Sequence, residues 1–283
     1  MSLKERLSEI LETWELDHIK RSYDIIGDIA VIKIPEKMEH KTNEVTKAVM
    51  QSNPHIKTIL RQTGPVTGEL RLRRLEWLAG EKKTETVHKE SGCLFKVDLE
   101  KCYFSPKLSF ERMRIAKQVT TGEVVVNMFA GVGCFSILMA KHAKPLKVYS
   151  IDVNSDAIRY LEENIKLNKA KYIVEVIEGD TKEVITKRLL NKADRVLMPL
   201  PEKALEYFDY ALLALKPTGG KIHYYDFVHA GRGIDPIEEV KKKVSEKLRG
   251  VNVSFEYAFG RIVRTVGPRW FQVALDINVH EKS

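Results

Sequence analysis

The stretch VVVNMFAGVGCFSILMA, residues 124–140, predicts a buried strand, a glycine turn and a helix. Val124 to Phe129 is β-branched and apolar apart from Asn127, which is typical of a central parallel strand. The residues after the glycines Gly131 and Gly133 have helical spacing. Glycines let the backbone approach a ligand closely, and the N–H groups at a helix start face it. The stretch therefore indicates a site for a nucleotide-like or carboxylate-bearing cofactor.

The chain around this stretch alternates between strands and helices. Strands are expected at residues 147–151, 172–177, 195–198 and 221–225, and helices at residues 156–168, 203–215 and 236–248. Two further strands, residues 253–259 and 270–279, follow with a loop from Arg261 to Arg269 between them. A doubly wound, mostly parallel sheet with a terminal antiparallel pair is what methyltransferases carry and dehydrogenases usually lack. We therefore expect an α/β fold, the Rossmann-like seven-stranded sheet of class I methyltransferases dependent on S-adenosylmethionine (SAM).

Three acceptors after successive strands match the needs of SAM. The loop from Asn127 to Gly133 accommodates the methionine portion, Asp152 accepts from both ribose hydroxyls, and Asp180 accepts from the adenine amino group. Each of these alone is also a common strand-end turn residue, so only their combination predicts a cofactor site. A nicotinamide cofactor is disfavoured because its fingerprint needs a third glycine where Ser136 stands.

Composition restricts the compartment and the partners. The 283 residues carry a formal net charge of +8, which fits an acidic macromolecular partner without requiring one. The three cysteines and eight histidines lack metal-ligand spacing, so we expect reduced thiols and no metal. The start of the chain is polar and no long apolar span follows. We expect a cytoplasmic protein that does not contact membranes.

The chain divides into two expected domains. Residues 1–100 form a small α+β domain for RNA binding or connection, and residues 101–283 form the catalytic domain. The first domain is expected to contain helices at residues 3–12 and 40–50 and strands at residues 56–63, 85–88 and 93–98. Residues 24–35 are expected to form a strand or a hairpin with a turn at Gly27-Asp28. Seven basic side chains against three acidic ones lie between Lys57 and Lys83, and a solvated hairpin face is the favoured explanation for them.

Several motifs, taken in order, resemble one family. They are GELR (68–71), CYFSPKLSFER (102–112), NMFAGVG (127–133), MPLP (198–201) and IHYY (222–225). Their order is similar to that of the archaeal and eukaryal tRNA (guanine37-N1)-methyltransferases, the Met-10-like family, and of their wyosine-pathway relatives. The YFSP and ER blocks and the FAGVG loop are specific. We expect no counterpart here of the separate N-terminal domain with which longer members hold the outer corner of tRNA.

The resemblance implies roles for individual residues. Glu111 is the base that removes the proton from guanine N1, and Arg71 is the cation that steadies charge on O6. The alternative for Glu111 is a surface helix carboxylate paired with a neighbouring arginine. The resemblance implies the following cofactor-binding residues: Tyr103, Phe104, Asn127, Phe129, Ala130, Gly131, Gly133, Asp152, Val153, Asp180 and Pro199.

Pro199 bears on the substrate. The N1-methylating members have asparagine at the start of an Asn-x-Pro turn here, whereas this chain has Met198-Pro199-Leu200-Pro201, which offers no side-chain amide. This variant resembles the archaeal branch that methylates C7 of 4-demethylwyosine as well as, or instead of, guanine N1. A neutral turn variant is the other explanation, and the two stay open. We therefore assign Pro199 to the catalytic set with Glu111 and Arg71.

The resemblance implies transfer of a methyl group from SAM to the purine at position 37 of the tRNA anticodon stem-loop. Arg261, Arg264 and Arg269 beside Trp270 suit contact with the RNA backbone, although a solvated hairpin is the rival explanation. Tyr224, Tyr225 and His223 either support the pocket or are ordinary core. A wyosine-pathway aminocarboxypropyl transferase and a catalytically silent tRNA-binding protein are the rival functions. We expect a monomer.

Overall fold

The computed structural model describes residues 3–18, 23–251 and 253–282 of the chain. These residues divide into two compact units, residues 1–109 and 110–283. The division falls later than the boundary expected after residue 100, because the residues that follow β6 in the sequence remain hydrogen-bonded to the first unit. The Cys102 N–H donates to the Asp98 carbonyl over 2.9 Å, and the Arg73 guanidinium donates to the Phe104 carbonyl over 2.8 Å.

The first unit combines helices with a mixed sheet. Its sheet has the order β1-β2-β3-β4, in which β2 and β3 are parallel and the other pairs antiparallel, and β5 and β6 form a separate hairpin. The strands are β1 (Asp24–Ile26), β2 (Ile29–Ile32), β3 (Thr58–Gln62), β4 (Leu75–Gly80), β5 (Glu85–Glu90) and β6 (Cys93–Asp98). The helices are α1 (Leu3–Ile10), α2 (Thr13–His18), η1 (Glu36–Lys41), α3 (Thr42–Ser52) and η2 (Pro106–Leu108).

The expected elements of the first unit are present, and α2 and β4 are additions. The hairpin turn at Gly27 needs glycine, since its φ is 56° and a Cβ there would lie 2.1 Å from Thr86 Oγ1. The strand β4 was not expected because Leu75–Gly80 lies half-exposed and lacks a regular apolar alternation.

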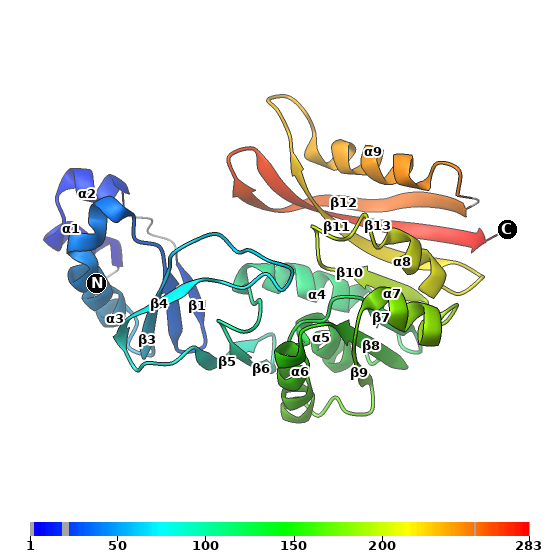
Figure 1. The fold of residues 1–283 in the computed structure, drawn as a ribbon, viewed down its shortest axis with the longest axis horizontal. Coiled ribbons are helices and arrows are strands. Elements are labelled where there is room, and N and C mark those ends of the chain that lie inside the picture. The colour runs from blue at the N-terminus through cyan, green and yellow to red at the C-terminus, as the bar shows by residue number, and fades with distance from the viewer. Residues whose placement is uncertain (1–2, 19–22, 252, 283) are drawn as a thin grey trace. The chain divides into compact units, whose positions relative to one another are not determined.

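In the described part of the second unit, seven strands form one sheet with the order β12-β13-β11-β10-β7-β8-β9 (Figure 1). The strands β11, β10, β7, β8 and β9 run parallel to one another, while β13 is antiparallel to both β11 and β12. This order confirms the expected class I methyltransferase architecture. The bounds are β7 (Val124–Asn127), β8 (Lys147–Asp152), β9 (Val174–Glu178), β10 (Arg195–Met198), β11 (Gly220–His229), β12 (Val253–Gly267) and β13 (Trp270–Lys282).

Helices cover both faces of this sheet (Figure 1). Two consecutive residues of β11 mark the two faces, because side chains alternate along a strand. Tyr224 packs against Phe208 of one layer, with ring centroids 5.6 Å apart, and Tyr225 faces Phe135 of the other layer at 6.2 Å. The helices are α4 (Ser109–Gln118), α5 (Cys134–His142), α6 (Ser155–Leu167), α7 (Thr181–Val184), η3 (Ile185–Leu189), α8 (Phe208–Ala214) and α9 (Pro236–Leu248).

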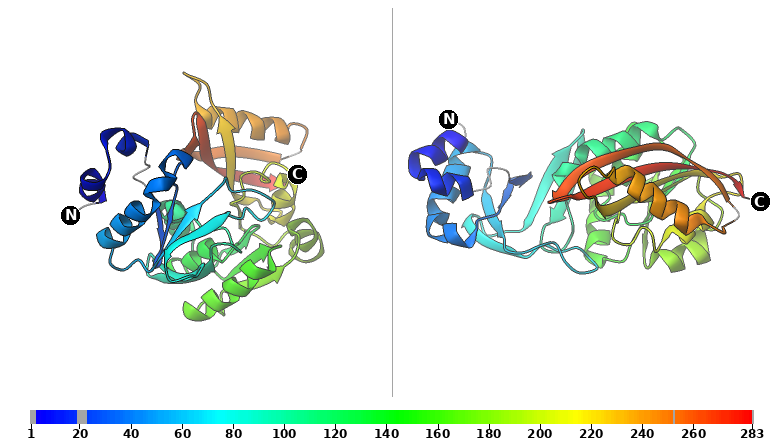
Figure 2. Two further views of the ribbon diagram at one scale, coloured as in Figure 1. Left: turned by 60° about the vertical axis from the view of Figure 1, so that its left-hand side comes forward. Right: turned by 90° about the horizontal axis from the view of Figure 1, so that it is seen from above.

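Two expectations for the second unit were wrong in their boundaries. Turns occupy the start of the helix expected from residue 203, and α8 begins only at Phe208. The loop expected from residue 261 to residue 269 is mostly strand, because β12 continues to Gly267 and pairs with β13 up to Trp270 (Figure 2). The β-branched residues from Ile262 to Val266 favour this extension.

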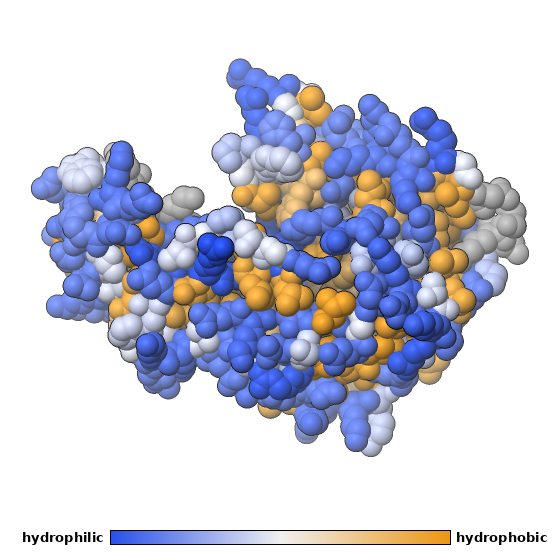
Figure 3. Space-filling view, viewed as in Figure 1, coloured by the Kyte–Doolittle hydropathy of each residue, from blue (hydrophilic) through white to orange (hydrophobic). Residues whose placement is uncertain are grey.

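The exterior is mostly hydrophilic on the face drawn in Figure 3, and apolar side chains reach it in separate patches. Exposed aromatic residues of the second unit include Phe110, Tyr172, Phe259 and Trp270. Within the described residues, no helix combines the length and apolar character needed to cross a membrane.

Candidate cofactor and catalytic site

The two glycines of the turn after β7 have different structural roles. Gly133, with φ 92°, begins α5, and a Cβ there would lie 2.2 Å from Leu161 Cδ1 of α6. Gly131, with φ 53°, has open space within 4 Å of a built Cβ. Gly133 therefore permits close packing of two helices, while Gly131 leaves room for a ligand to approach the backbone.

Asp152, at the end of β8, is held in a fixed orientation. Its Oδ2 accepts from the Gly131 N–H over 2.7 Å, and its Oδ1 accepts from the Asn154 N–H over 3.0 Å. Burial raises the pKa of Asp152, although these backbone donors oppose the shift. The next residue, Val153, is 49% exposed. A carboxylate is thus aimed at the same edge of the sheet as the open side of Gly131.

Asn127, the last residue of β7, is fully buried. Its Nδ2 donates to Ser136 Oγ over 3.1 Å, whereas its Oδ1 has no hydrogen-bond partner in the part of the chain that is described. Buried acceptors are nearly always satisfied. This oxygen is therefore available to a donor from outside the chain, which fits a cofactor with amino groups.

Two aromatic side chains, Phe129 and Tyr207, pack against each other near the carboxyl ends of β7 and β9. Phe129 meets Tyr207 edge to face, with centroids 5.2 Å apart, and the Tyr207 hydroxyl donates to Asp180 Oδ2 over 3.1 Å. Asp180 also caps α7 by accepting from the Lys182 N–H over 2.7 Å. Burial, followed by the hydrogen bond to Asp180, raises the pKa of Tyr207 to about 12. Sequence reasoning missed Tyr207, which lies in a turn where a helix was expected.

Glu111, in the first turn of α4, is 1% exposed, so the alternative of a surface carboxylate was wrong. It is nevertheless paired with a neighbouring arginine. Arg114 Nη2 donates to Oε1 over 2.7 Å and Arg114 Nε to Oε2 over 3.0 Å. The Tyr225 hydroxyl donates to Oε1 over 2.8 Å. Three donor groups thus fix the orientation of one buried carboxyl group.

The Arg114 guanidinium also binds a second buried carboxylate, Asp276 of β13, with Nη2 2.9 Å from Oδ1. The His223 ring lies between Asp276 and Arg195. Its Nδ1 is 2.7 Å from Asp276 Oδ1, and its Nε2 is 2.6 Å from Arg195 Nη1. An arginine only donates, so His223 Nε2 accepts and Nδ1–H donates to Asp276. His223 is therefore a neutral tautomer.

The charge states of this chain of contacts follow from burial and pairing. Burial lowers the pKa of His223, which agrees with its neutral form. Burial opposes ionisation of Asp276, but the hydrogen bonds from His223 and Arg114 hold its pKa well below the usual range. Arg195 Nε in turn donates to Glu123 Oε2 over 2.7 Å. The Glu111 carboxylate thus stands at one end of a continuous buried polar network.

The sequence offered a partial signal for this network. Tyr225 and His223, which the sequence predicts to be either pocket supports or ordinary core, bond to Glu111 and Asp276 respectively. Tyr224, their neighbour in the IHYY motif, faces the opposite layer and donates to Asp226 over 3.2 Å. Arg114 and Asp276 were missed. They are 162 positions apart in the sequence, and only the placement of β13 beside β11 brings them together.

The first unit holds three of the expected site residues. The Arg71 guanidinium lies over the Tyr103 ring, 4.1 Å from its centroid, and Arg71 has a left-handed φ of 55°. Phe104 is buried and meets His88 edge to face at 5.2 Å. A left-handed conformation costs a non-glycine residue roughly 1–2 kcal/mol. Arg71 is thus held in an unfavourable backbone conformation directly beside an aromatic ring.

Pro199 follows β10 directly and is half-buried, at the same edge of the sheet as Asn127 and Asp152. Parallel strands bind ligands at their carboxyl ends. The second unit therefore gathers Pro199, the glycine turn, Asp152 and Asp180 at one edge, which is where a class I cofactor site is expected.

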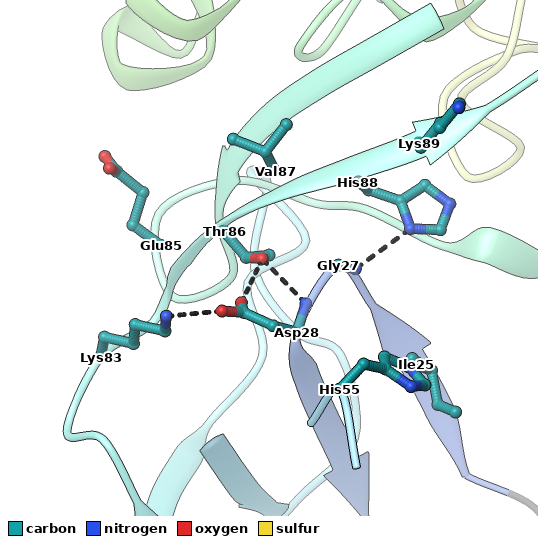
Figure 4. A pocket seen from close by; sticks show the side chains of 10 residues that line it. All are labelled: Ile25, Gly27, Asp28, His55, Lys83, Glu85, Thr86, Val87, His88 and Lys89. Atoms are coloured by element: carbon teal, nitrogen blue, oxygen red, sulfur yellow. Dashed lines mark hydrogen bonds and ion pairs between the residues drawn. The ribbon is translucent and has the colours of Figure 1, made fainter. Parts of the chain in front are cut away.

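A hollow in the first unit is lined by ten residues, and Figure 4 shows them. The Asp28 carboxylate accepts hydrogen bonds from two other lining residues, from Lys83 Nζ over 2.7 Å and from Thr86 Oγ1 over 2.7 Å. His88 Nδ1 accepts from the Gly27 N–H over 3.2 Å. Asp28 and Lys83 thus pair with each other within the hollow, whereas Glu85 pairs with Lys96, which lies outside the lining.

Among the seven basic side chains between Lys57 and Lys83, Arg61, Arg73 and Lys83 form ion pairs. Arg61 binds Glu39 and Glu76, and Arg73 binds Asp24. These ion pairs favour a structural role for that segment. Over residues 3–18, 23–251 and 253–282, no group of three or more His, Cys, Asp and Glu side chains is placed to hold a metal ion.

Both parts of the chain match family models. Residues 3–84 match the TYW2 N-terminal domain, and residues 86–254 match the TRM5/TYW2 methyltransferase domain. The tRNA (guanine(37)-N(1))-methyltransferase Trm5b of Pyrococcus abyssi is 42% identical over 91% of this chain and 74% of that protein. The tRNA 4-demethylwyosine(37)-methyltransferase Taw21 of Saccharolobus solfataricus is 39% identical over 99% of both chains.

Solved structures agree with these matches. The complex of aTrm5 and tRNALeu has a TM-score of 0.84 and 36% identity, covering 98% of this chain and 78% of that one. TYW2 of P. horikoshii in complex with MeSAdo has a TM-score of 0.81 and 28% identity, covering 99% of this chain and 98% of that one. With its seven-stranded sheet, its glycine turn and both matched domains, this chain belongs to the TRM5/TYW2 methyltransferase family.

Proposed function

We propose that this protein is a SAM-dependent tRNA methyltransferase that modifies the purine at position 37. The observation that carries the proposal is the Asp152 carboxylate, oriented by the Gly131 N–H beside the open side of that glycine. Relatives that act on position 37 of tRNA support the choice of substrate. We propose action on the anticodon stem-loop, as a monomer and in the cytoplasm, where tRNA is used.

The cofactor-binding residues are proposed from the geometry of each unit. Asp152 would accept from the ribose hydroxyls, Asp180 from the adenine amino group, and Val153 and Phe129 would contact the adenine ring. The backbone from Ala130 to Gly133 and the unpaired Asn127 Oδ1 would serve the methionine portion. Tyr103, Phe104 and Pro199 complete the proposed set. When bound, SAM supplies an electrophilic methyl group on a sulfonium.

We propose C7 of 4-demethylwyosine as the principal acceptor atom. Pro199 supports this choice because it offers no amide to the edge of a guanine. The match to Taw21 over 99% of both chains supports it as well. A tricyclic base with a carbon nucleophile needs less hydrogen bonding at its edge and more apolar room than guanine does.

Glu111 is the proposed proton acceptor in either reaction. Bond formation at C7 leaves a ring proton on that carbon, and transfer of this proton to Glu111 returns its electron pair to the ring. With guanine, Glu111 removes the N1 proton and the Arg71 guanidinium stabilises the charge that gathers on O6. Direct in-line transfer requires no covalent bond between enzyme and RNA.

The decisive experiment incubates the full chain with isotope-labelled SAM and two anticodon-stem RNAs. One RNA carries guanine at position 37 and the other carries 4-demethylwyosine. Nucleoside mass spectrometry should find methyl addition on the second RNA, at C7. Addition of an aminocarboxypropyl group would establish the rival transferase, and RNA binding without any product would establish the silent binding protein.

A further inference from the structure

An exposed aromatic ring stands next to the buried Glu111. Phe110, in the first turn of α4, is 69% exposed. The Arg261 guanidinium of β12 lies over this ring, 4.8 Å from its centroid. A ring has two faces, and one cation covers only one of them. The large exposed fraction means that the other face is open to solvent, although an apolar ring in water is unfavourable.

Arg261 connects this ring to the carboxylate. Its Nη1 lies 3.7 Å from Glu111 Oε2. Two residues earlier on β12, Phe259 is 43% exposed and lies under the Arg114 guanidinium, 4.9 Å from its ring centroid. Two stacks of arginine on phenylalanine therefore flank the proposed proton acceptor.

The surroundings favour RNA over a protein as the occupant. From Tyr257 to Trp270 the chain has three arginines and no acidic residue. The exposed apolar side chains Ile262, Val266 and Trp270 alternate with these arginines along the β12–β13 hairpin. Aromatic rings interleaved with arginine are typical of surfaces that bind single-stranded nucleic acid, since every base has a face that can stack.

We propose that the open face of Phe110 is a stacking subsite for the nucleobase directly adjacent to the target purine in the RNA strand. The inference rests on the proposed function. A target base drawn toward Glu111 must leave its neighbours, and leaving the stack is unfavourable. Phe110 replaces the lost stacking partner of one neighbour, while Arg261 holds the ring from behind.

The test measures the dissociation constants of stem-loop RNAs by fluorescence anisotropy. Three RNAs are compared: one intact, one abasic at position 36 and one abasic at position 38. Phe110→Ala should weaken binding of intact RNA about tenfold. In wild-type protein one of the two abasic sites should cause a similar loss, and that site should cause no further loss in Phe110→Ala.

Two further variants keep the result interpretable. Phe110→Trp, which retains a stacking face, should restore binding of the intact RNA. Tyr172→Ala removes a ring that is 90% exposed elsewhere in the same unit and should bind like wild type. The inference is overturned if both abasic losses persist in full in Phe110→Ala, or if Phe110→Ala binds intact RNA as Tyr172→Ala does.

Methyl transfer is recorded separately on the same RNAs. Phe110-dependent binding with no methylated product on any RNA, including 4-demethylwyosine RNA, would contradict the proposed function and leave the subsite standing. Methylated product with Phe110-independent binding would remove the subsite alone.

Discussion

The Tyr225 hydroxyl donates to Glu111 Oε1 over 2.8 Å and thereby ties the middle of β11 to the first turn of α4. Tyr225→Phe removes this donor and leaves the ring in place. Because the carboxylate then has more freedom to rotate, we expect kcat to fall about tenfold, with less effect on KM. Single-turnover methyl transfer measures the change.

The matched control for Tyr225→Phe is Tyr224→Phe. Tyr224 is equally buried but bonds to Asp226 on the opposite layer. A variant at Tyr224 that reduced kcat as strongly as the one at Tyr225 would contradict the orienting role.

Glu111→Gln should abolish proton acceptance while keeping the volume of the side chain. A general base contributes about 10²–10⁴ to a rate, so a loss of that size in kcat is expected. SAM affinity, measured by calorimetry, should stay within about twofold, since none of the proposed cofactor contacts involves Glu111. Full activity of this variant would remove the assigned role.

The two glycines after β7 should respond differently to alanine. Gly133→Ala places a methyl group against Leu161, so the free energy of unfolding should fall by roughly 1–3 kcal/mol. Gly131→Ala meets open space and should instead weaken SAM binding at a smaller cost in stability. Urea unfolding and calorimetry on both variants check this, and equal losses of stability would refute the division of roles.

His223 should make stability depend on pH. Burial lowers the pKa of His223 in the folded state below the ordinary value of 6.5. Below pH 6.5 this imidazole therefore binds a proton in the unfolded chain more readily than in the folded chain. Its contribution is present above pH 6.5 and is lost as the pH falls below that value, by about 1.4 kcal/mol per pH unit.

Urea unfolding between pH 7 and pH 5 should show this slope in wild type and a smaller slope in His223→Gln. An amide can still donate to Asp276 and accept from Arg195. His229→Gln, at the exposed end of the same strand, removes a histidine without touching Asp276 and should retain the wild-type slope.

Pro199→Asn should move the product distribution toward guanine N1. The new amide can bond to the edge of a guanine, which proline cannot do. We expect methylation of guanine-37 RNA to rise relative to 4-demethylwyosine RNA, as measured by nucleoside mass spectrometry. Pro201→Asn is the control, and an equal shift from both variants would indicate a general effect on the turn.

The sequence predicted the second unit better than the first because its signals are local. Buried β-branched strands and the turn around Gly131 can be read without knowing the fold. The partners of Glu111 cannot, because Tyr225 and Asp276 come from distant strands and each looks like an ordinary core or strand residue. The strand β4 was missed for a related reason, since the half-exposed Trp77 gives no periodic signal.

The length of β12 raises a separate question of solubility. As the outermost strand of its sheet, it presents 15 residues whose outer backbone groups offer a second copy of the chain a place to pair. Its register with β13 shifts at four points, between Val253 and Phe255, Tyr257 and Phe259, Ile262 and Arg264, and Thr265 and Gly267. Each irregularity bends the edge away from a straight ladder, and the arginines add charge repulsion between copies. The hairpin can therefore remain long and exposed without becoming a template for aggregation.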